Sequence, residues 1–144
     1  MTITGPSWRL AMSCAQTEVL QIRHSEDVVR VRQAVRARAI EAGFGLVDQT
    51  KIVTAASELA RNTLDYGLGG TVQIDLFEVP RRGVRLIFED RGPGIPDTEK
   101  ALTDGYTTGG GLGLGLGGAR RLSNEFSIDS RVNEGTRVTI ARWR

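Results

Sequence analysis

Residues 109–118 contain seven glycines in ten positions, and this run limits the possible fold more than any other segment. Ordering so many glycines is costly, because glycine loses more conformational freedom on folding than any other residue. Leucines alternate with the glycines and ordered elements are expected on both sides, which argues against a disordered linker. Backbone amides converging on phosphate groups, at the start of a helix near Leu116, would offset the lost entropy. The run consists of Gly109, Gly110, Gly111, Leu112, Gly113, Leu114, Gly115, Leu116, Gly117 and Gly118.

Two familiar glycine-rich phosphate motifs do not account for this run. Gly113, Gly115 and Gly118 satisfy the pattern G-x-G-x-x-G, but a dinucleotide-binding fingerprint needs an apolar strand directly before its glycines. Residues 104–108 are polar and turn-like instead. A P-loop is excluded as well, because no Gly-Lys-Ser/Thr follows the glycines. The run therefore indicates a phosphate-binding loop of another kind.

Length and composition indicate an ordinary globular domain. The 144 residues are 40% hydrophobic and 25% charged, and we expect one domain over residues 1–144 with a disordered start at about residues 1–7. No apolar stretch is long enough to cross a membrane. The single cysteine excludes an internal disulfide and fits the cytoplasm. With 19 basic and 17 acidic residues, the net charge of +2 does not indicate nucleic-acid binding.

The hydrophobic pattern predicts α and β elements in a fixed order. Tight turns between consecutive strands imply antiparallel pairs, with the helices packed on one face of the sheet. We therefore predict a two-layer α/β sandwich with a mixed, mainly antiparallel sheet. The expected elements are a strand at 8–15, a helix from its N-cap Ser25 to its C-terminal glycine Gly43, a helix at 47–66, strands at 71–79 and 84–89, helices at 96–103 and 116–125, and strands at 126–131 and 136–143.

Glu58 and Asn62 stand four residues apart on the second expected helix, so they project from one face, one turn apart. An amide oxygen is a hard ligand that suits Mg²⁺, and a carboxylate can orient or deprotonate an attacking hydroxyl. This pair therefore fits phosphoryl transfer. Taken alone, the same pair would more often be an ordinary surface pair.

Asp90 ends an apolar strand and begins the sequence Asp-Arg-Gly-Pro-Gly. Its carboxylate can accept a hydrogen bond from the exocyclic amine of adenine, whereas guanine presents a carbonyl there and would be repelled. Gly92 and Gly94 would let the backbone approach the ring, although a plain turn explains them equally well. Thr136, at the start of the last strand, could bring a hydroxyl near the same base, although taken alone it is an ordinary hairpin threonine.

Three segments together resemble the Bergerat ATP-binding fold of the GHKL superfamily, shared by gyrase, Hsp90, histidine kinases and MutL. The resemblance is closer to the small bacterial serine/threonine kinases of the anti-sigma-factor group, above all the RsbT-like switch kinases of the stressosome. It covers the chain from about Leu20 to Trp143. The segments are residues 56–62 (ASELARN), 89–96 (EDRGPGIP) and 111–116 (GLGLGL).

The resemblance implies a role for each candidate residue. Glu58 would be the catalytic base and Asn62 the Mg²⁺ ligand, while Asp90 and Thr136 would contact the adenine of ATP. Gly92 and Gly94 would form the nucleotide-facing turn, and residues 111–115 the lid over ATP. Two positions depart from the family pattern: Gly117 replaces a frequent proline, and Asp65 adds an acid one turn beyond Asn62.

The resemblance also implies a partner that carries the phosphate acceptor. The only histidine, His24, precedes the first helix and is read as structural or exposed, so an acceptor in another polypeptide is expected. The family implies a serine or threonine of a STAS-domain protein, and a switch in which the freed kinase engages a PP2C-type phosphatase or a sigma factor. Four arginines of the first helix form either a docking surface or a solvated face, namely Arg30, Arg32, Arg36 and Arg38.

Three functions remain open at this point. The chain is expected to be a protein serine/threonine kinase, an anti-sigma factor that uses its kinase activity as an off-switch, or an ATP-binding adaptor without catalysis. Because both Glu58 and Asn62 are present, the adaptor is the least favoured of the three. The kinase and the anti-sigma factor differ in whether their surface binds a sigma subunit, and no single sequence motif indicates that property.

Overall fold

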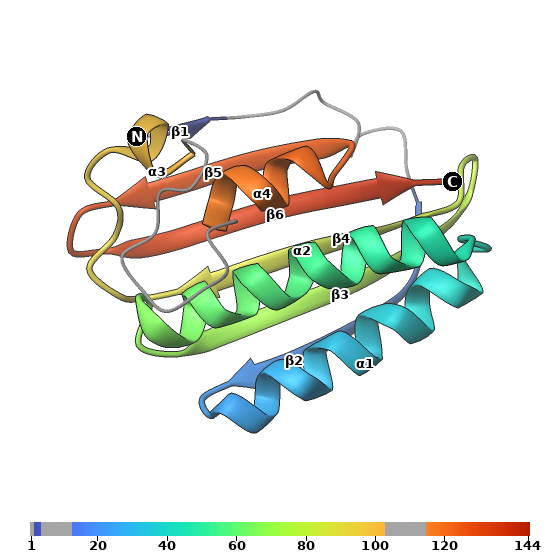
Figure 1. Cartoon of the computed structure of the whole chain (residues 1–144), viewed down its shortest axis with the longest axis horizontal. Coiled ribbons are helices and arrows are strands. Elements are labelled where there is room, and N and C mark those ends of the chain that lie inside the picture. Colours follow the sequence, from blue (N-terminus) through green and yellow to red (C-terminus); the bar gives the residue numbers. More distant parts are fainter. Residues whose placement is uncertain (1, 4–12, 103–114) are drawn as a thin grey trace.

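The computed structural model describes residues 2–3, 13–102 and 115–144, which form a sheet layer and a helix layer (Figure 1). The strands are β1 (Thr2–Ile3), β2 (Ser13–Ile22), β3 (Gly70–Val79), β4 (Gly83–Asp90), β5 (Glu125–Arg131) and β6 (Gly135–Trp143). The helices are α1 (Ser25–Glu41), α2 (Leu46–Asp65), α3 (Thr98–Ala101) and α4 (Gly115–Arg121).

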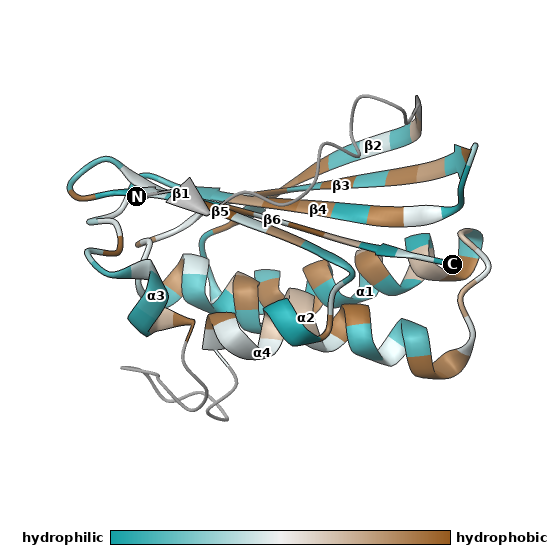
Figure 2. Ribbon diagram, turned by 90° about the horizontal axis from the view of Figure 1, so that it is seen from above, coloured by the Kyte–Doolittle hydropathy of each residue, from teal (hydrophilic) through white to brown (hydrophobic). Residues whose placement is uncertain are grey.

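The sheet has the strand order β1-β5-β6-β4-β3-β2, and every pairing among the described strands is antiparallel. Figure 2 shows the helices on one side of this sheet. The predicted two-layer α/β sandwich is therefore confirmed, with a sheet that is wholly antiparallel in the described part rather than mixed. None of the described helices combines the length and the apolar character needed to cross a membrane.

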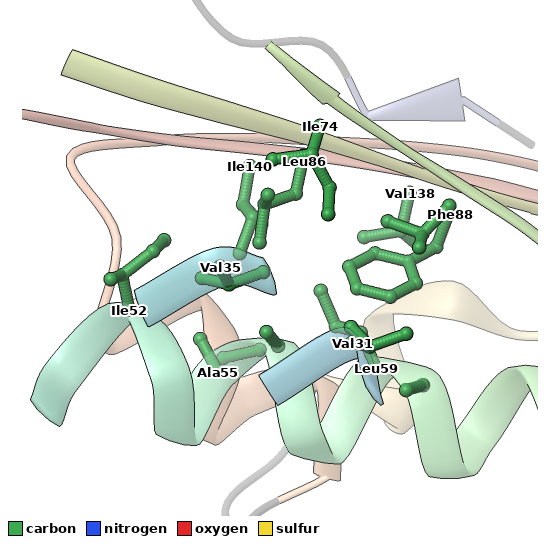
Figure 3. Close-up of a cluster of buried hydrophobic side chains, with 14 of the residues drawn as sticks. Val31, Val35, Ile52, Ala55, Leu59, Ile74, Leu86, Phe88, Val138 and Ile140 are labelled. Carbon is green, nitrogen blue, oxygen red and sulfur yellow. The ribbon is translucent and has the colours of Figure 1, made fainter. Parts of the chain in front are cut away.

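The core lies between the sheet layer and the helix layer, and its side chains recur at the spacings expected for strands and for helices. Side chains two apart on β3, β4 and β6 point at the helices, and side chains three or four apart on α1 and α2 point back at them (Figure 3). Each such side chain that is fully buried stabilises the fold by roughly 1.5–3 kcal/mol. Those labelled in Figure 3 are Val31, Val35, Ile52, Ala55, Leu59, Ile74, Leu86, Phe88, Val138 and Ile140.

Helix α1 begins one residue earlier than predicted, because its N-cap is His24 rather than Ser25. Asp27 lies three residues after this cap, and its Oδ2 accepts hydrogen bonds from the backbone N–H groups of Arg23 at 2.8 Å and His24 at 3.0 Å. These two bonds are the main reason why the pKa of Asp27 lies below its usual value, and the charge of Arg30 acts in the same direction. The capping box of α1 is thus fixed by the ionised carboxylate.

We expect Asp27→Asn to lower the unfolding temperature at neutral pH, because the amide binds the two backbone N–H groups more weakly than a carboxylate does. Since the pKa is lowered in the folded protein, the contribution exists above the ordinary pKa of 3.8 and is lost as pH falls through the folded value. Thermal unfolding at pH 7 and in acid should therefore show a difference that shrinks on acidification. Glu26→Gln, an exposed change in the same helical turn, is the control, and an equal effect there would contradict the assignment.

The first strand was predicted at residues 8–15, and residues 13–15 do lie in β2, but β2 continues to Ile22, so the end of the strand was predicted seven residues too early. Residues 8–12 lie outside the described residues. β2 is an edge strand that carries polar side chains, and this weakened the apolar signal by which a strand is recognised. Thr2 and Ile3 pair with β5, whereas disorder was predicted over residues 1–7. Two predicted helices are shorter than expected, since α3 ends at Ala101 and α4 ends at Arg121, whereas the predicted helix at 116–125 reached into β5. The remaining predicted elements are present with shifts of one or two residues at their ends.

Candidate functional site

Helix α2 brings Glu58 and Asn62 to the edge of the core. Its apolar side packs against the sheet, which leaves Glu58 almost buried, at 8% exposed, and Asn62 half-buried one turn later. Asn62 lines a partly open cavity of about 240 Å³. Glu58 lies one turn before it and is not among the described residues lining that cavity.

The cavity lies between α2 and the strands β4 and β6, with α3 and the start of α4 beside it. Its wall is mainly apolar, and polar groups come from the neighbouring residues Asp90 and Thr136 of the sheet and from Asn62 of α2. A largely apolar hollow with a few polar groups is typical of a site for a small flat ligand. The apolar lining comes from Leu59, Phe88, Pro93, Ile95, Pro96, Ala101, Leu116 and Val138.

Asp90 is the last residue of β4 and lies opposite Thr136 of β6 in the strand register. Its Oδ1 accepts a hydrogen bond from the backbone N–H of Gly92 at 2.9 Å. Burial raises the pKa of Asp90 above its ordinary value, the nearby charge of Glu89 adds to this, and backbone hydrogen bonds from Gly92 and Thr136 oppose it. The carboxylate is therefore an acceptor held in a poorly solvated wall, where a ligand donor would be strongly preferred.

Three glycines around Asp90 are needed for close backbone approach. A Cβ at Gly67 would lie 2.4 Å from Asp90 Cγ, and one at Gly92 would lie 2.7 Å from Gly67 Cα. Gly94 has a φ of +78°, and a Cβ there would lie 2.2 Å from the Arg131 carbonyl oxygen. The structure thus explains why glycine is needed at positions 92 and 94, which the sequence did not. Each glycine makes room for the backbone of another segment, and Gly94 also lines the cavity.

We expect Gly67→Ala to displace the Asp90 carboxylate, since its methyl group would overlap that side chain. Overpacking of this kind costs typically about 1–3 kcal/mol of unfolding free energy. Denaturant unfolding and titration with ATP should show lower stability and weaker binding together. Gly45→Ala, at the N-cap of α2 in open space, is the control for binding, and ATP affinity should not change there. Equal affinities of the Gly67 variant and the unchanged chain would contradict this account.

Ser130 and Gly67 are site residues that sequence reasoning missed. Ser130 is buried on β5, and its Oγ lies 2.8 Å from Thr136 Oγ1. One signal was present for it, because a serine follows Phe126 and Ile128 in the inward-facing row of an apolar strand. No sequence signal marks Gly67, since its role comes from its contact with a residue 23 positions later.

Most of the predicted site residues in the described part of the chain meet at one place. The predicted residues that line the cavity are Asn62, Asp90, Gly94, Gly115, Leu116 and Thr136. The predicted nucleotide-binding residues Gly109 and Gly110, and the predicted lid residues Gly111, Leu112, Gly113 and Leu114, lie outside the described residues. Asp65 is exposed at the end of α2, and Gly117 is buried in α4.

The residues present are compatible with Mg²⁺ held jointly by the protein and a nucleotide. In residues 2–3, 13–102 and 115–144, no group of three or more histidine, cysteine or acidic side chains lies close enough together to hold a metal. Mg²⁺ bound with a nucleotide takes one or two protein oxygens, and phosphates and waters complete its shell. The half-buried amide oxygen of Asn62 at the cavity wall meets that smaller requirement.

Comparison with known proteins places this geometry in a family. A family model described as "Histidine kinase-, DNA gyrase B-, and HSP90-like ATPase" matches residues 47–144. The serine/threonine-protein kinase RsbT of Bacillus subtilis (strain 168) is 48% identical over 118 residues, which cover 81% of this chain and 89% of RsbT. An anti-sigma F factor of Clostridium novyi (strain NT) is 30% identical over 132 residues, which cover 87% of this chain and 90% of that protein.

A solved structure has the same fold. The structure of full-length ShkA in complex with AMPPNP matches 94% of this chain and 33% of the ShkA chain, with a TM-score of 0.53 and 21% sequence identity. The predicted family and fold are confirmed by these matches, and the predicted class of enzyme agrees with the name of the relative from Bacillus subtilis. The chain belongs to the histidine kinase-, DNA gyrase B- and HSP90-like ATPases, in the branch that contains the serine/threonine-protein kinase RsbT and the anti-sigma F factors.

Proposed function

We propose that this chain is a protein kinase that transfers phosphate from Mg²⁺-ATP to a serine or threonine of a STAS-domain partner. The observation that carries the proposal is the apolar cavity in which Asp90 and Thr136 lie at one wall and Asn62 of α2 at another. The family supplies the expectation of ATP binding, and the relative named as a serine/threonine kinase supports the choice of acceptor.

The proposed recognition of adenine uses both the apolar and the polar side chains of the cavity wall. Apolar side chains such as Phe88 and Val138 receive the faces and edges of the ring. Asp90 accepts a hydrogen bond from the exocyclic amine, and the Thr136 hydroxyl supplies a second polar contact. GTP would place a carbonyl against the Asp90 carboxylate, so the site should select ATP.

Helix α2 supplies the groups for transfer. Glu58 is the proposed base, which takes the proton of the acceptor hydroxyl as this oxygen attacks the γ-phosphorus of ATP. The bond from the γ-phosphorus to the oxygen bridging the β-phosphate breaks, and ADP leaves. Asn62 is the proposed metal ligand. When bound, Mg²⁺ would neutralise charge on the phosphate oxygens. Because Glu58 and Asn62 stand one turn apart on a packed helix, their spacing is fixed before substrate arrives.

Only part of the arginine set on α1 is available as a candidate docking surface. Arg36 and Arg38 are only partly exposed: Arg36 Nη1 donates to Gln49 Oε1 at 3.3 Å, and Arg38 pairs with Glu41 at 2.7 Å. Arg30 and Arg32 are exposed, although Arg30 also pairs with Asp27. We propose that Arg30 and Arg32 form the part of α1 that meets an acidic region of the partner.

A second function has support from the anti-sigma F relatives, which are about as long as this chain. In that case the chain would bind a sigma factor, and phosphorylation of a STAS antagonist would reverse the binding. A PP2C-type phosphatase is the alternative partner after release. These partners would use the outer surface, and the same ATP site would serve either function.

The test is phosphate transfer from γ-labelled ATP to purified STAS-domain proteins of the same genome. We expect a labelled serine or threonine, dependence on Mg²⁺, and little transfer from GTP. In parallel, the chain is offered the sigma factors of that genome with and without ATP. Labelling without sigma binding supports the kinase, and sigma binding supports the second function. A failure to bind ATP would contradict both.

A further inference from the structure

Ser130 is a buried serine in the inward-facing row of β5, and its side chain is 1% exposed. The register places it opposite Thr136 of β6, which in turn lies opposite Asp90 of β4. Directly opposite residues of an antiparallel pair share one face of the sheet. The three side chains therefore form a row across three strands that ends at the proposed adenine contact.

The Ser130 hydroxyl joins two separate parts of the cavity wall. Its Oγ accepts a hydrogen bond from the backbone N–H of Ile95 at 2.7 Å and lies 2.8 Å from Thr136 Oγ1. Ile95 follows the turn that contains Gly94, and both Ile95 and Thr136 line the cavity. One hydroxyl thus links the turn after β4 to the threonine at the start of β6.

We propose that Ser130 is a positioning residue for nucleotide recognition, which holds the Thr136 hydroxyl toward the purine and couples it to the turn at Ile95. The inference rests on the proposed ATP-binding function. A threonine hydroxyl has one proton and two lone pairs, and it rotates unless a partner fixes it. The contact with Ser130 fixes one hydrogen-bonding direction of the Thr136 hydroxyl from within the sheet. The remaining hydrogen-bonding directions of this hydroxyl are therefore oriented before a ligand enters the cavity. Ser130 itself is enclosed and acts through Thr136.

The test is a double-mutant cycle on ATP affinity, measured by calorimetry with the full chain. Ser130→Ala should raise the dissociation constant of ATP about five- to tenfold, the effect of losing one oriented hydrogen bond. Thr136→Val removes the hydroxyl but keeps the branched shape. In that background, Ser130→Ala should have no further effect, because the hydroxyl it positions is gone. Ser127→Ala, on the opposite face of the same strand, is the matched control and should bind ATP normally.

The outcomes separate this role from a structural one and from failure of the ATP site. Equal losses from Ser130→Ala in both backgrounds would mean that the serine only supports the fold, and this would overturn the proposal. If Ser130→Ala does not fold, the double-mutant cycle is repeated with Ser130→Cys, which places a weaker hydrogen-bonding group at the same position. Failure of both variants to fold would also overturn the proposal. Absence of ATP binding by the unchanged chain would instead overturn the proposed function.

Discussion

Glu58→Gln is expected to abolish phosphate transfer while leaving ATP bound. The substitution keeps the shape of an almost buried side chain and removes only its ability to take a proton. A positioned general base contributes about 10²- to 10⁴-fold to a rate, so transfer to the partner should fall by that factor. The dissociation constant of ATP should stay unchanged, because Glu58 is not among the described residues that line the cavity.

The measurement is the initial rate of labelling of the proposed STAS-domain substrate, with ATP affinity determined separately. Glu78→Gln, an exposed change on β3, is the control for loss of a carboxylate and should transfer phosphate at the original rate. Transfer by Glu58→Gln at more than about a tenth of the original rate would remove the residue from the role of base. A fall in ATP affinity would assign it to binding instead.

Asp90→Asn is expected to weaken ATP binding by about 100-fold. A hydrogen bond to a charged acceptor contributes about 1.5–3 kcal/mol, and each 1.4 kcal/mol is a factor of ten in affinity. The Asn amide can also present a donor toward the adenine amine, which donates as well. The same donor is favourable toward the guanine carbonyl, so GTP should bind better than before. The ratio of ATP affinity to GTP affinity should therefore fall by a larger factor than ATP affinity does. An unchanged ratio would contradict contact between residue 90 and the base.

The same substitution has an opposite effect on the protein without nucleotide. Because burial raises the pKa of Asp90, the folded protein holds a proton there more tightly than the unfolded chain does. Stability from this group is therefore greatest below the ordinary value of 3.8 and declines as pH rises through the raised value. Relative to the unchanged chain, Asp90→Asn should gain unfolding temperature over that acidic window and keep the gain at neutral pH. A loss that grows with pH would contradict the assigned direction.

The fold was largely predictable because the core strands and helices carry clear periods. Val31 and Val35 recur at helical spacing, and Leu86 and Phe88 alternate as a strand requires. The start of α1 was misplaced although its signal was present, since the acid at residue 27 marks a cap three residues earlier. The edge strand β2 was misplaced because most of its side chains are exposed and several are polar, so its apolar alternation is weak.

The site was predictable where a residue acts through its own chemistry, and not where it acts through a neighbour distant in sequence. Asp90 and Asn62 could be singled out because their own side-chain chemistry fits an ATP site once the segments that carry them are considered together, although each alone has an ordinary explanation. Gly67 and Ser130 depend on which segments the register brings together. That register arises from the packing of the whole sheet, which no local pattern reports.

The cavity walls come from both layers of the fold, with α2 and α4 on one side and β4 and β6 on the other. A nucleotide bound there would act as a non-covalent cross-link between halves that must separate when the chain unfolds. At 100 times its dissociation constant, a ligand adds about 2.7 kcal/mol to stability. Resistance to proteases, and with it the lifetime of the protein, should therefore rise and fall with the supply of ATP.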